Sequence, residues 1–358
     1  MTDSGNAPTA ASGIRPTGAR SDYRGGEVPA RVRAESWAER YGLLVLLVAL
    51  IALFALLPAS GRAFWSVANF QAAIANQGVG LVVALALLLP MAAGFFDFSV
   101  GALTAASSVV AAAALSQFRL PLVVAVVMAI IFGLLIGTVI GALVSYLKMT
   151  AFIATLGVAP LLGGAIFAYT GGLQITSGIP AELTDFGSKS IVGVPVIALA
   201  AAVVALVVWY VMSQTPFGRR LFAIGANPVA AELTGTRVAR QRMLAFAASG
   251  TIAGIAGVLL LARQGAATSD NGMSMLFPAL TAVLLSTIVI DVGRPSVLGT
   301  VIGILFVAVS VSGLTLLGTP AWVSQVFNGA ALLIAVGFAR LSVLWRRAGA
   351  VRSPQGTS

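Results

Sequence analysis

The sequence contains no cysteine and no histidine among its 358 residues, and only 9% of the residues are charged. Without cysteine the chain can form neither a disulfide framework nor a thiolate metal site. Without histidine it can supply neither an imidazole base nor a Ser-His catalytic pair. These absences exclude imidazole-based catalysis, and we expect no metal site and no enzymatic activity.

Charge is scarce because apolar residues dominate: 59% of the chain is hydrophobic and the mean hydropathy is +1.01. Soluble domains carry about a quarter charged residues, so the composition predicts a polytopic membrane protein. A membrane-spanning helix needs roughly 20 apolar residues, and the chain can supply about ten. We therefore expect an all-α fold with about ten transmembrane helices, at 41–58, 69–93, 98–115, 121–146, 151–170, 193–212, 242–262, 274–290, 296–317 and 322–341.

The distribution of basic residues predicts the orientation of these helices. The net charge is +10, but the basic residues are spread over short loops and both ends, which argues for membrane topology and against a nucleic-acid partner. With the N-terminal tail placed in the cytoplasm, the acidic loop carrying Glu182 and Asp185 falls outside. The basic groups that then fall inside are Lys148, the arginines of 215–242, Arg294, Arg346 and Arg347. We expect both termini to be cytoplasmic, in the inner or plasma membrane.

Composition also divides the chain. Residues 1–40 are rich in Gly, Ser, Ala and Arg, and predict a disordered cytoplasmic tail. This stretch is not a signal peptide, because the first apolar run starts only at Tyr41 and continues at spanning length. Residues 41–345 form the transmembrane domain, and 346–358 a cytoplasmic C-terminal tail.

Some spans carry signs of interruption or close packing. The prolines within apolar runs predict breaks at Pro90, Pro160 and Pro278. The run "IFGLLIGTVIGALVSY" places glycines at a four-residue spacing, Gly133, Gly137 and Gly141. Such a small-residue face allows two helices to approach closely, so we expect it to pack against a neighbouring helix.

One carboxylate, Asp97, lies within the apolar stretch "MAAGFFDFSVG". A carboxylate at the centre of a membrane helix costs about 2.5–3.5 kcal/mol on insertion scales. The small residues around it, Gly94, Ser99 and Gly101, indicate a helix break. Asp97 could cap the helix that opens after the break, accepting from its first amides. It could also lie beside a transport path, and the sequence leaves both interpretations open.

Four stretches, in this order, resemble the membrane permeases of ribose-type ABC importers. They are "GFFDFSVGAL", "FIATLG" followed by "TGG", "FGRRLFAIGANPVAAELTG" and "SVLGTVIG". The resemblance covers about residues 41–345. The chain departs from the family pattern at Phe95, Phe96 and Phe98, and after Gly272, where it has no acidic residue before Asp291.

The resemblance implies that 213–242 is a coupling loop on which a separate ABC ATPase subunit docks. A topology signal needs only basic residues, whereas this segment also carries the conspicuous pattern "AIGANPVAAELTG". Ala231 and Gly235 are four residues apart, so we expect them to share a helix face that meets the ATPase. The candidate coupling residues are Gly218, Arg219, Gly225, Asn227, Ala230, Ala231, Glu232, Leu233 and Gly235.

The implied function is that of an importer permease for a small neutral sugar, such as a pentose or hexose. Its implied partners are the ATPase, an extracytoplasmic sugar-binding protein, a second permease in a homodimer or heterodimer, and membrane lipid. The chain has no GxxxxGK[ST] motif, so it carries no cofactor and the ATPase subunit binds the ATP. Candidate path residues are Asn76, Gln77, Asp97, Ser99, Thr155, Thr170 and Gln174.

Two alternatives remain open. One is an ABC permease for nucleosides or branched-chain amino acids. The other is an ion-coupled secondary carrier, which would normally need paired carboxylates or histidines within the bilayer. Asp97 is the only well-buried candidate for that role.

Overall fold

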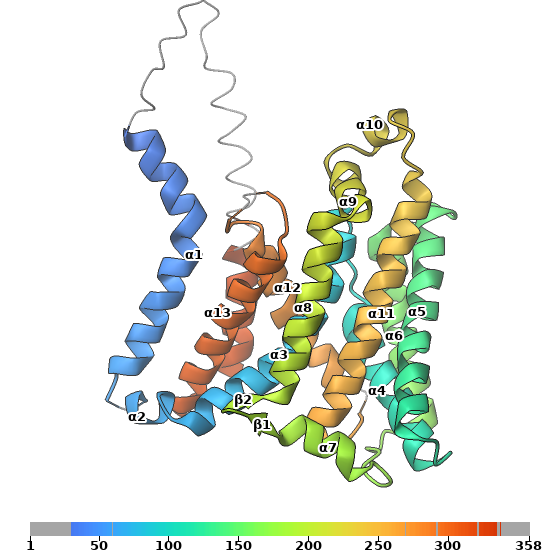
Figure 1. Ribbon diagram of the computed structural model, residues 1–358, viewed down its shortest axis with the longest axis horizontal. Coiled ribbons are helices and arrows are strands. Elements are labelled where there is room, and N and C mark those ends of the chain that lie inside the picture. Colours follow the sequence, from blue (N-terminus) through green and yellow to red (C-terminus); the bar gives the residue numbers. More distant parts are fainter. Residues whose placement is uncertain are drawn as a thin grey trace, which may run out of the picture.

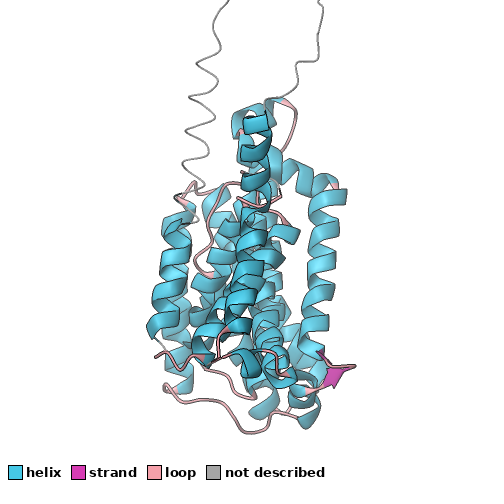
Figure 2. Cartoon of the chain, turned by 90° about the vertical axis from the view of Figure 1, so that its left-hand side faces the viewer, coloured by secondary structure: helices cyan, strands magenta, loops and turns pink. Residues whose placement is uncertain are grey.

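The computed structural model describes residues 30–334, except 59, 269, 291, 292 and 321, together with residue 337. The described chain is a bundle of helices, and its strands form a single small hairpin (Figures 1 and 2). The hairpin joins β1 (Ser190–Ile191) to β2 (Val194–Pro195) in antiparallel register. The expected all-α class is therefore confirmed.

The helices follow one another with short connections. The first half contains α1 (Ala30–Leu56), α2 (Gly61–Phe64), α3 (Val67–Ala92), α4 (Val100–Ser116), α5 (Leu122–Ser145), α6 (Ala151–Thr170) and α7 (Ala181–Ser188). The second half contains α8 (Val196–Gln214), α9 (Pro216–Ala226), α10 (Pro228–Leu233), α11 (Val238–Gln264), α12 (Asp270–Ser286) and α13 (Val297–Leu316). A last apolar helix covers Trp322–Ile334.

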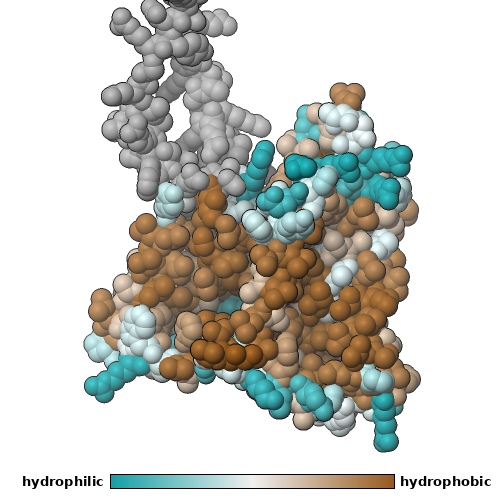
Figure 3. All heavy atoms as spheres, in the orientation of Figure 1, coloured by the Kyte–Doolittle hydropathy of each residue, from teal (hydrophilic) through white to brown (hydrophobic). Residues whose placement is uncertain are grey.

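Within the described part of the chain, 6 helices are long and apolar enough to cross a membrane: α3, α5, α6, α8, α11 and α13. Shorter apolar helices cover Tyr41–Leu56, Val100–Ser116, Ser274–Ser286 and Trp322–Ile334. Each expected apolar run thus contains a helix in its described part. On the face shown in Figure 3, apolar residues fill a middle band and hydrophilic residues gather at the two ends. That is the surface a protein presents to a bilayer.

One expectation about the ends of elements needs correction. The helix α1 begins at Ala30, so part of the tail expected to be disordered is helical. The stretch Ala30–Arg40 contains no Gly or Pro and is rich in the good helix formers Ala, Arg and Glu. Residues 1–29 and 346–358, the rest of the two expected tails, lie outside the described residues.

The prolines do not break their helices. Pro160 and Pro278 lie inside α6 and α12, and α3 continues for two residues beyond Pro90. A membrane helix tolerates the missing N–H when neighbouring groups satisfy the freed carbonyl. The predicted interruptions at these three residues are therefore wrong.

The glycine face of α5 packs where it was expected to pack. Gly133, Gly137 and Gly141 are buried against α11. A Cβ at Gly137 would lie 3.0 Å from the Cα of Gly250, and one at Gly141 would lie 2.9 Å from the Cα of Met243. The two backbones are therefore in direct contact, and the predicted packing role of this face is confirmed.

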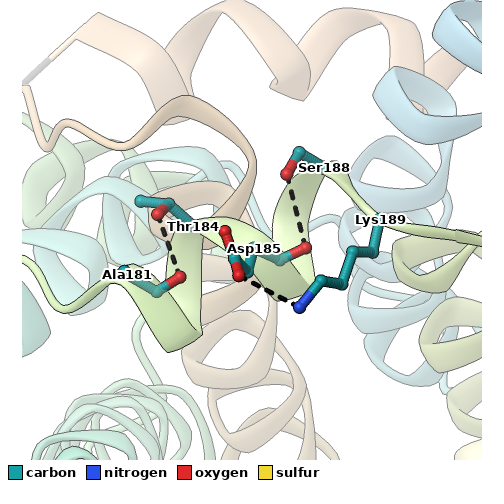
Figure 4. A network of polar contacts seen from close by, with 5 residues as sticks. All are labelled: Ala181, Thr184, Asp185, Ser188 and Lys189. Atoms are coloured by element: carbon teal, nitrogen blue, oxygen red, sulfur yellow. Dashed lines mark hydrogen bonds and ion pairs between the residues drawn. The ribbon is translucent and has the colours of Figure 1, made fainter.

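The acidic loop forms a short helix, α7, at the end of the bundle opposite α9 and α10 (Figure 1). Figure 4 shows its polar side: Lys189 Nζ donates to Asp185 Oδ2 at 3.0 Å, and Thr184 Oγ1 donates to the carbonyl of Ala181 at 3.1 Å. Gly187 lies against the backbone of Ala262, near the end of α11. Its missing side chain lets α7 lie directly on the bundle.

Candidate coupling segment and intramembrane break

Helices α9 and α10 project at one end of the bundle (Figure 1). The helix α9 is amphipathic: it buries Gly218, Leu221 and Ile224, and exposes Arg219 and Arg220. Gly218 approaches the backbone of Met212, at the end of α8, too closely for any side chain. The segment is therefore folded back onto the bundle, with its arginines in the polar zone.

The short helix α10 has well-defined ends. The side chain of Asn227 accepts from the amide of Ala230 at 3.1 Å, and Pro228 occupies the first helical position. Gly235 follows the helix with φ +80°, a left-handed conformation that favours glycine. Asn227 and Gly235 therefore shape the loop.

The exposed face of α10 is not the one expected from the sequence. Ala231 is only 5% exposed and packs into the core, whereas Val229 and Leu233 are 66% and 85% exposed. Gly235 lies beyond the helix end. The expectation that Ala231 and Gly235 share an exposed helix face is therefore wrong, since α10 ends at Leu233 and turns Ala231 inward. Ala230 and Glu232 are exposed.

The other end of the segment contacts the membrane domain. Gly225, in the last turn of α9, lies against the carbonyl of Ala92 at the end of α3. Gly94 lies on the other side of this contact, and a Cβ added to it would lie 3.7 Å from the Cα of Gly225. Any side chain at Gly225 would meet backbone and not a flexible side chain. The coupling segment is therefore in rigid contact with the chain that follows α3.

That chain is the break predicted around Asp97. After α3 ends at Ala92, residues 93–99 are non-helical, and α4 begins at Val100. Asp97 is 3% exposed; its Oδ1 accepts from the amide of Ser99 at 3.0 Å and also from the Ser99 hydroxyl. Its Oδ2 accepts from Ser249 Oγ, on α11, at 3.3 Å. The N-cap residue of α4 is Ser99, so Asp97 holds the turn before the helix, whereas the capping interpretation expected it to accept from the first helical amides. Its bond to Ser249 ties the break to α11.

Three phenylalanines that depart from the family pattern pack around this break. Phe98 contacts Phe152 of α6 edge-on with ring centroids 5.6 Å apart, and Phe96 packs against Phe98 at a tilt, with centroids 6.3 Å apart. Phe95 lies 6.2 Å from Phe246 of α11 and carries the Arg242 guanidinium 4.9 Å from its centroid. Aromatic packing thus holds the 93–99 segment between α6 and α11.

Several candidate path residues have hydrogen-bond partners within their own helices. Thr155 is fully buried and its hydroxyl donates to the carbonyl of Ala151, in its own helix, at 2.8 Å. Thr170 likewise donates to Ile166 at 2.9 Å. Gln77 is half-buried in α3, and Gln174 is exposed in the loop after α6. A hydrogen bond joins two of the candidates, from the amide of Ser99 to Asp97.

Two polar partners were missed at the sequence level. Arg263 Nε, at the end of α11, donates to Asn76 Oδ1 of α3 at 3.1 Å. Ser249, the partner of Asp97, is 152 residues away in the chain. Neither residue carries a local sequence signal, because each pair is formed only by the packing of α11 against distant elements.

The hydrogen bonds of Asp97 make a stability prediction. Asp97→Asn should keep the protein expressed with a melting temperature near that of the wild type, because the amide oxygen can still accept from Ser99 and the amide NH2 can donate to the Ser249 hydroxyl. Asp97→Leu leaves these donors unpaired in the interior and should destabilise the fold by about 0.5–2 kcal/mol or more. Thermal unfolding in detergent measures the difference, with Ser249→Ala as the milder control. Equal destabilisation by Asn and Leu would show that the charge itself is needed.

The comparisons with known proteins agree on one family. Residues 69–336 match the model described as the branched-chain amino acid transport system / permease component. The chain is 36% identical over 300 residues to the probable ABC transporter permease protein YphD of Escherichia coli, covering 82% of this chain and 87% of that protein. No solved structure matches the chain significantly.

Two further relatives have names that state a substrate. The ribose import permease protein RbsC of Bacillus subtilis is 33% identical over 307 residues, 86% of this chain and 94% of that protein. The autoinducer 2 import system permease protein LsrD of Yersinia enterocolitica is 34% identical over 260 residues, 71% of this chain and 78% of that protein. With a match across most of its length, this chain belongs to the permease-component family of these transport systems.

Proposed function

We propose that this chain is the transmembrane permease subunit of an ABC importer and forms the translocation path for a small neutral sugar. The observation that carries the proposal is the folded segment α9–α10. It presents the apolar Val229 and Leu233 beyond the apolar band and contacts the chain after α3 through Gly225. Exposed apolar residues one turn apart on a projecting helix favour a protein partner that covers them. An ATPase subunit docked there is the partner that supplies energy.

The substrate is proposed from the relatives and from the chemistry of the chain. Relatives of similar length are named for the import of ribose and of autoinducer 2. The candidate path residues other than Asp97 are neutral hydrogen-bonding groups, which suit a hydroxylated solute. The carboxylate of Asp97 already accepts hydrogen bonds from Ser99 and Ser249, so it is poorly placed to bind a coupling ion.

Branched-chain amino acids are the second candidate substrate, favoured by the printed description of the family model. A zwitterionic solute needs charged partners, whereas a sugar needs neutral ones. Thermal-shift screening of the cognate binding protein separates the two. Stabilisation by sugars and not by leucine, isoleucine or valine supports the proposal, and the reverse result overturns the substrate assignment.

The proposed assembly contains two permease chains, as a homodimer or heterodimer, two ATPase subunits and an extracytoplasmic binding protein. ATP-driven closure of the ATPases would move α9 and α10. That movement would pass through Gly225 and Gly94 to the Asp97 break, opening the path to one side and then to the other. The chain itself supplies no ATP chemistry.

The proposed topology has about ten crossings with both termini in the cytoplasm. It is supported by α1 beginning at the same end as α9 and α10, and by α7 and the hairpin lying at the other end (Figure 1). Reporters inserted at Val192 and Gly235, both in exposed turns, should report opposite sides of the membrane. Activity of a cytoplasm-dependent reporter at Gly235 alone is the expected result. The same side for both positions would contradict an odd number of crossings between them.

Dependence on partners tests the ABC proposal directly. Reconstituted alone, the chain should neither hydrolyse ATP nor accumulate sugar against a gradient. With the ATPase and the binding protein added, uptake should require ATP and should be insensitive to a protonophore. Gradient-driven uptake by the single chain that collapses with a protonophore would establish a secondary carrier instead.

A further inference from the structure

A cavity of about 300 Å³ lies beside the coupling segment, between α8, α9 and the beginning of α13. Its inner wall is apolar and buried, formed by Leu88 of α3 and Met212 of α8. Two exposed arginines also line it: Arg219 of α9 and Arg294, which lies just before α13. The cavity thus joins an apolar wall to two cations at the end of the bundle where α9 and α10 project.

Neither arginine is neutralised by a described carboxylate. Among the side chains that the structure describes, the ion pair is Lys189 with Asp185, at the opposite end of the bundle. Two guanidinium groups lining one cavity suit an anion with several oxygens, because each can donate a forked pair of hydrogen bonds to phosphate. The charge therefore favours a phosphate group.

The surroundings favour a phosphate that carries acyl chains. Trp209 and Leu298 also line the cavity, and they are 38% and 58% exposed. Tryptophan is enriched where the acyl region meets the headgroups, and an exposed leucine beside it offers a surface for an acyl chain. The first turn of α13 adds the positive end of its helix dipole to the charge of the arginines.

We propose that this cavity binds the headgroup phosphate of an anionic phospholipid, held between Arg219 and Arg294, with an acyl chain against Trp209 and Leu298. Basic pockets between membrane helices are known to hold such headgroups. Because Arg219 belongs to α9, a bound lipid would attach the coupling segment to the membrane. The inference needs only that the chain spans a membrane, and stands whichever solute is transported.

Lipid retention by the purified chain tests the proposal without any transport assay. In native mass spectrometry the wild type should retain phosphatidylglycerol in preference to phosphatidylethanolamine, and phosphatidylglycerol should raise its thermal stability in detergent. Arg219→Gln and Arg294→Gln should each weaken retention of phosphatidylglycerol about fivefold, because each removes one cation that attracts the anionic headgroup. The double variant should weaken retention about 25-fold. Equal retention of the two lipids by the wild type overturns the proposal.

Three comparisons make the assignment specific. Arg220→Gln removes the neighbouring exposed arginine of α9, which does not line the cavity, and should leave lipid retention unchanged. A loss of retention equal to that of Arg219→Gln would mean diffuse electrostatic attraction and no specific site.

Ser213→Glu places a carboxylate at the exposed edge of the cavity and should abolish the preference for phosphatidylglycerol even if the double arginine variant fails to fold. Inorganic phosphate alone should not stabilise the protein. Stabilisation by phosphate equal to that by the lipid would assign a free anion, and retention unaffected by Ser213→Glu would place the lipid elsewhere.

Discussion

Replacing Leu233 with aspartate should prevent the permease from capturing its ATPase subunit while leaving the permease inserted and present at normal levels. Leu233 is 85% exposed at the end of α10, and Val229 lies one turn before it on the same helix. A large apolar side chain exposed to water gains most when a partner covers it. Buried anchors of this kind contribute about 2 kcal/mol or more to an interface, so ATPase co-purification should fall about 30-fold or more.

Matched changes separate docking from general damage. Val192→Asp makes a similar substitution at an exposed apolar residue, in the hairpin turn at the opposite end of the bundle, and should leave ATPase capture unchanged. Glu232→Lys, on an exposed and solvated neighbour, should weaken capture by about 1 kcal/mol or less. Normal capture by Leu233→Asp would mean that α10 does not form the docking surface and that the segment serves only to orient the chain.

The choice of Leu233 for this experiment shows where sequence patterns stop being sufficient. The pattern "AIGANPVAAELTG" located the segment, but it placed Gly235 on a helix face, whereas Gly235 follows the end of α10 in a left-handed turn. It could not say which side of a six-residue helix faces inward. That is decided by how α9 folds back on Met212 and Ala92, contacts between residues far apart in the chain.

The membrane helices were the most predictable part of the fold. Long apolar runs must satisfy their backbone groups internally, so a helix is the available solution, and each expected run contains a helix in its described part. The packing role of the glycine face of α5 was equally predictable, because glycines spaced four residues apart in a membrane helix mainly allow a second helix to approach closely. The helix breaks predicted at the prolines were wrong, because Pro160 and Pro278 lie inside continuous helices.

The Asp97 break was predictable in place but not in partners. A carboxylate among small residues in an apolar run indicated the helix break, but Asp97 accepts from Ser99, the N-cap residue itself, and not from the first amides of α4. Its tie to Ser249, and the position of the break against the coupling segment, come from tertiary packing alone. The polar residues proposed for the path remain candidates, since Thr155 and Thr170 already donate to carbonyls of their own helix.

The contact between Gly225 and Ala92 leads to the second large effect: Gly225→Leu should separate ATPase binding from transport. A side chain at Gly225 meets the carbonyl of Ala92, which is backbone and cannot rotate away. Overpacking of this kind costs about 1–3 kcal/mol, and the strain is relieved if α9 moves away from the end of α3. The exposed face of α10 is not altered by the change. We therefore expect near-normal ATPase capture but uptake reduced about tenfold or more.

Ala226→Leu is the matched control, because it places the same leucine side chain at the exposed neighbouring position of α9. It should leave both ATPase capture and uptake near wild-type levels. Uptake and ATPase stimulation by loaded binding protein are measured in the same proteoliposomes, with permease abundance determined in each preparation. Parallel loss of capture and uptake in Gly225→Leu would mean that the substitution unfolds the segment. Full uptake would mean that movement reaches the Asp97 break by a route other than the contact between α9 and α3.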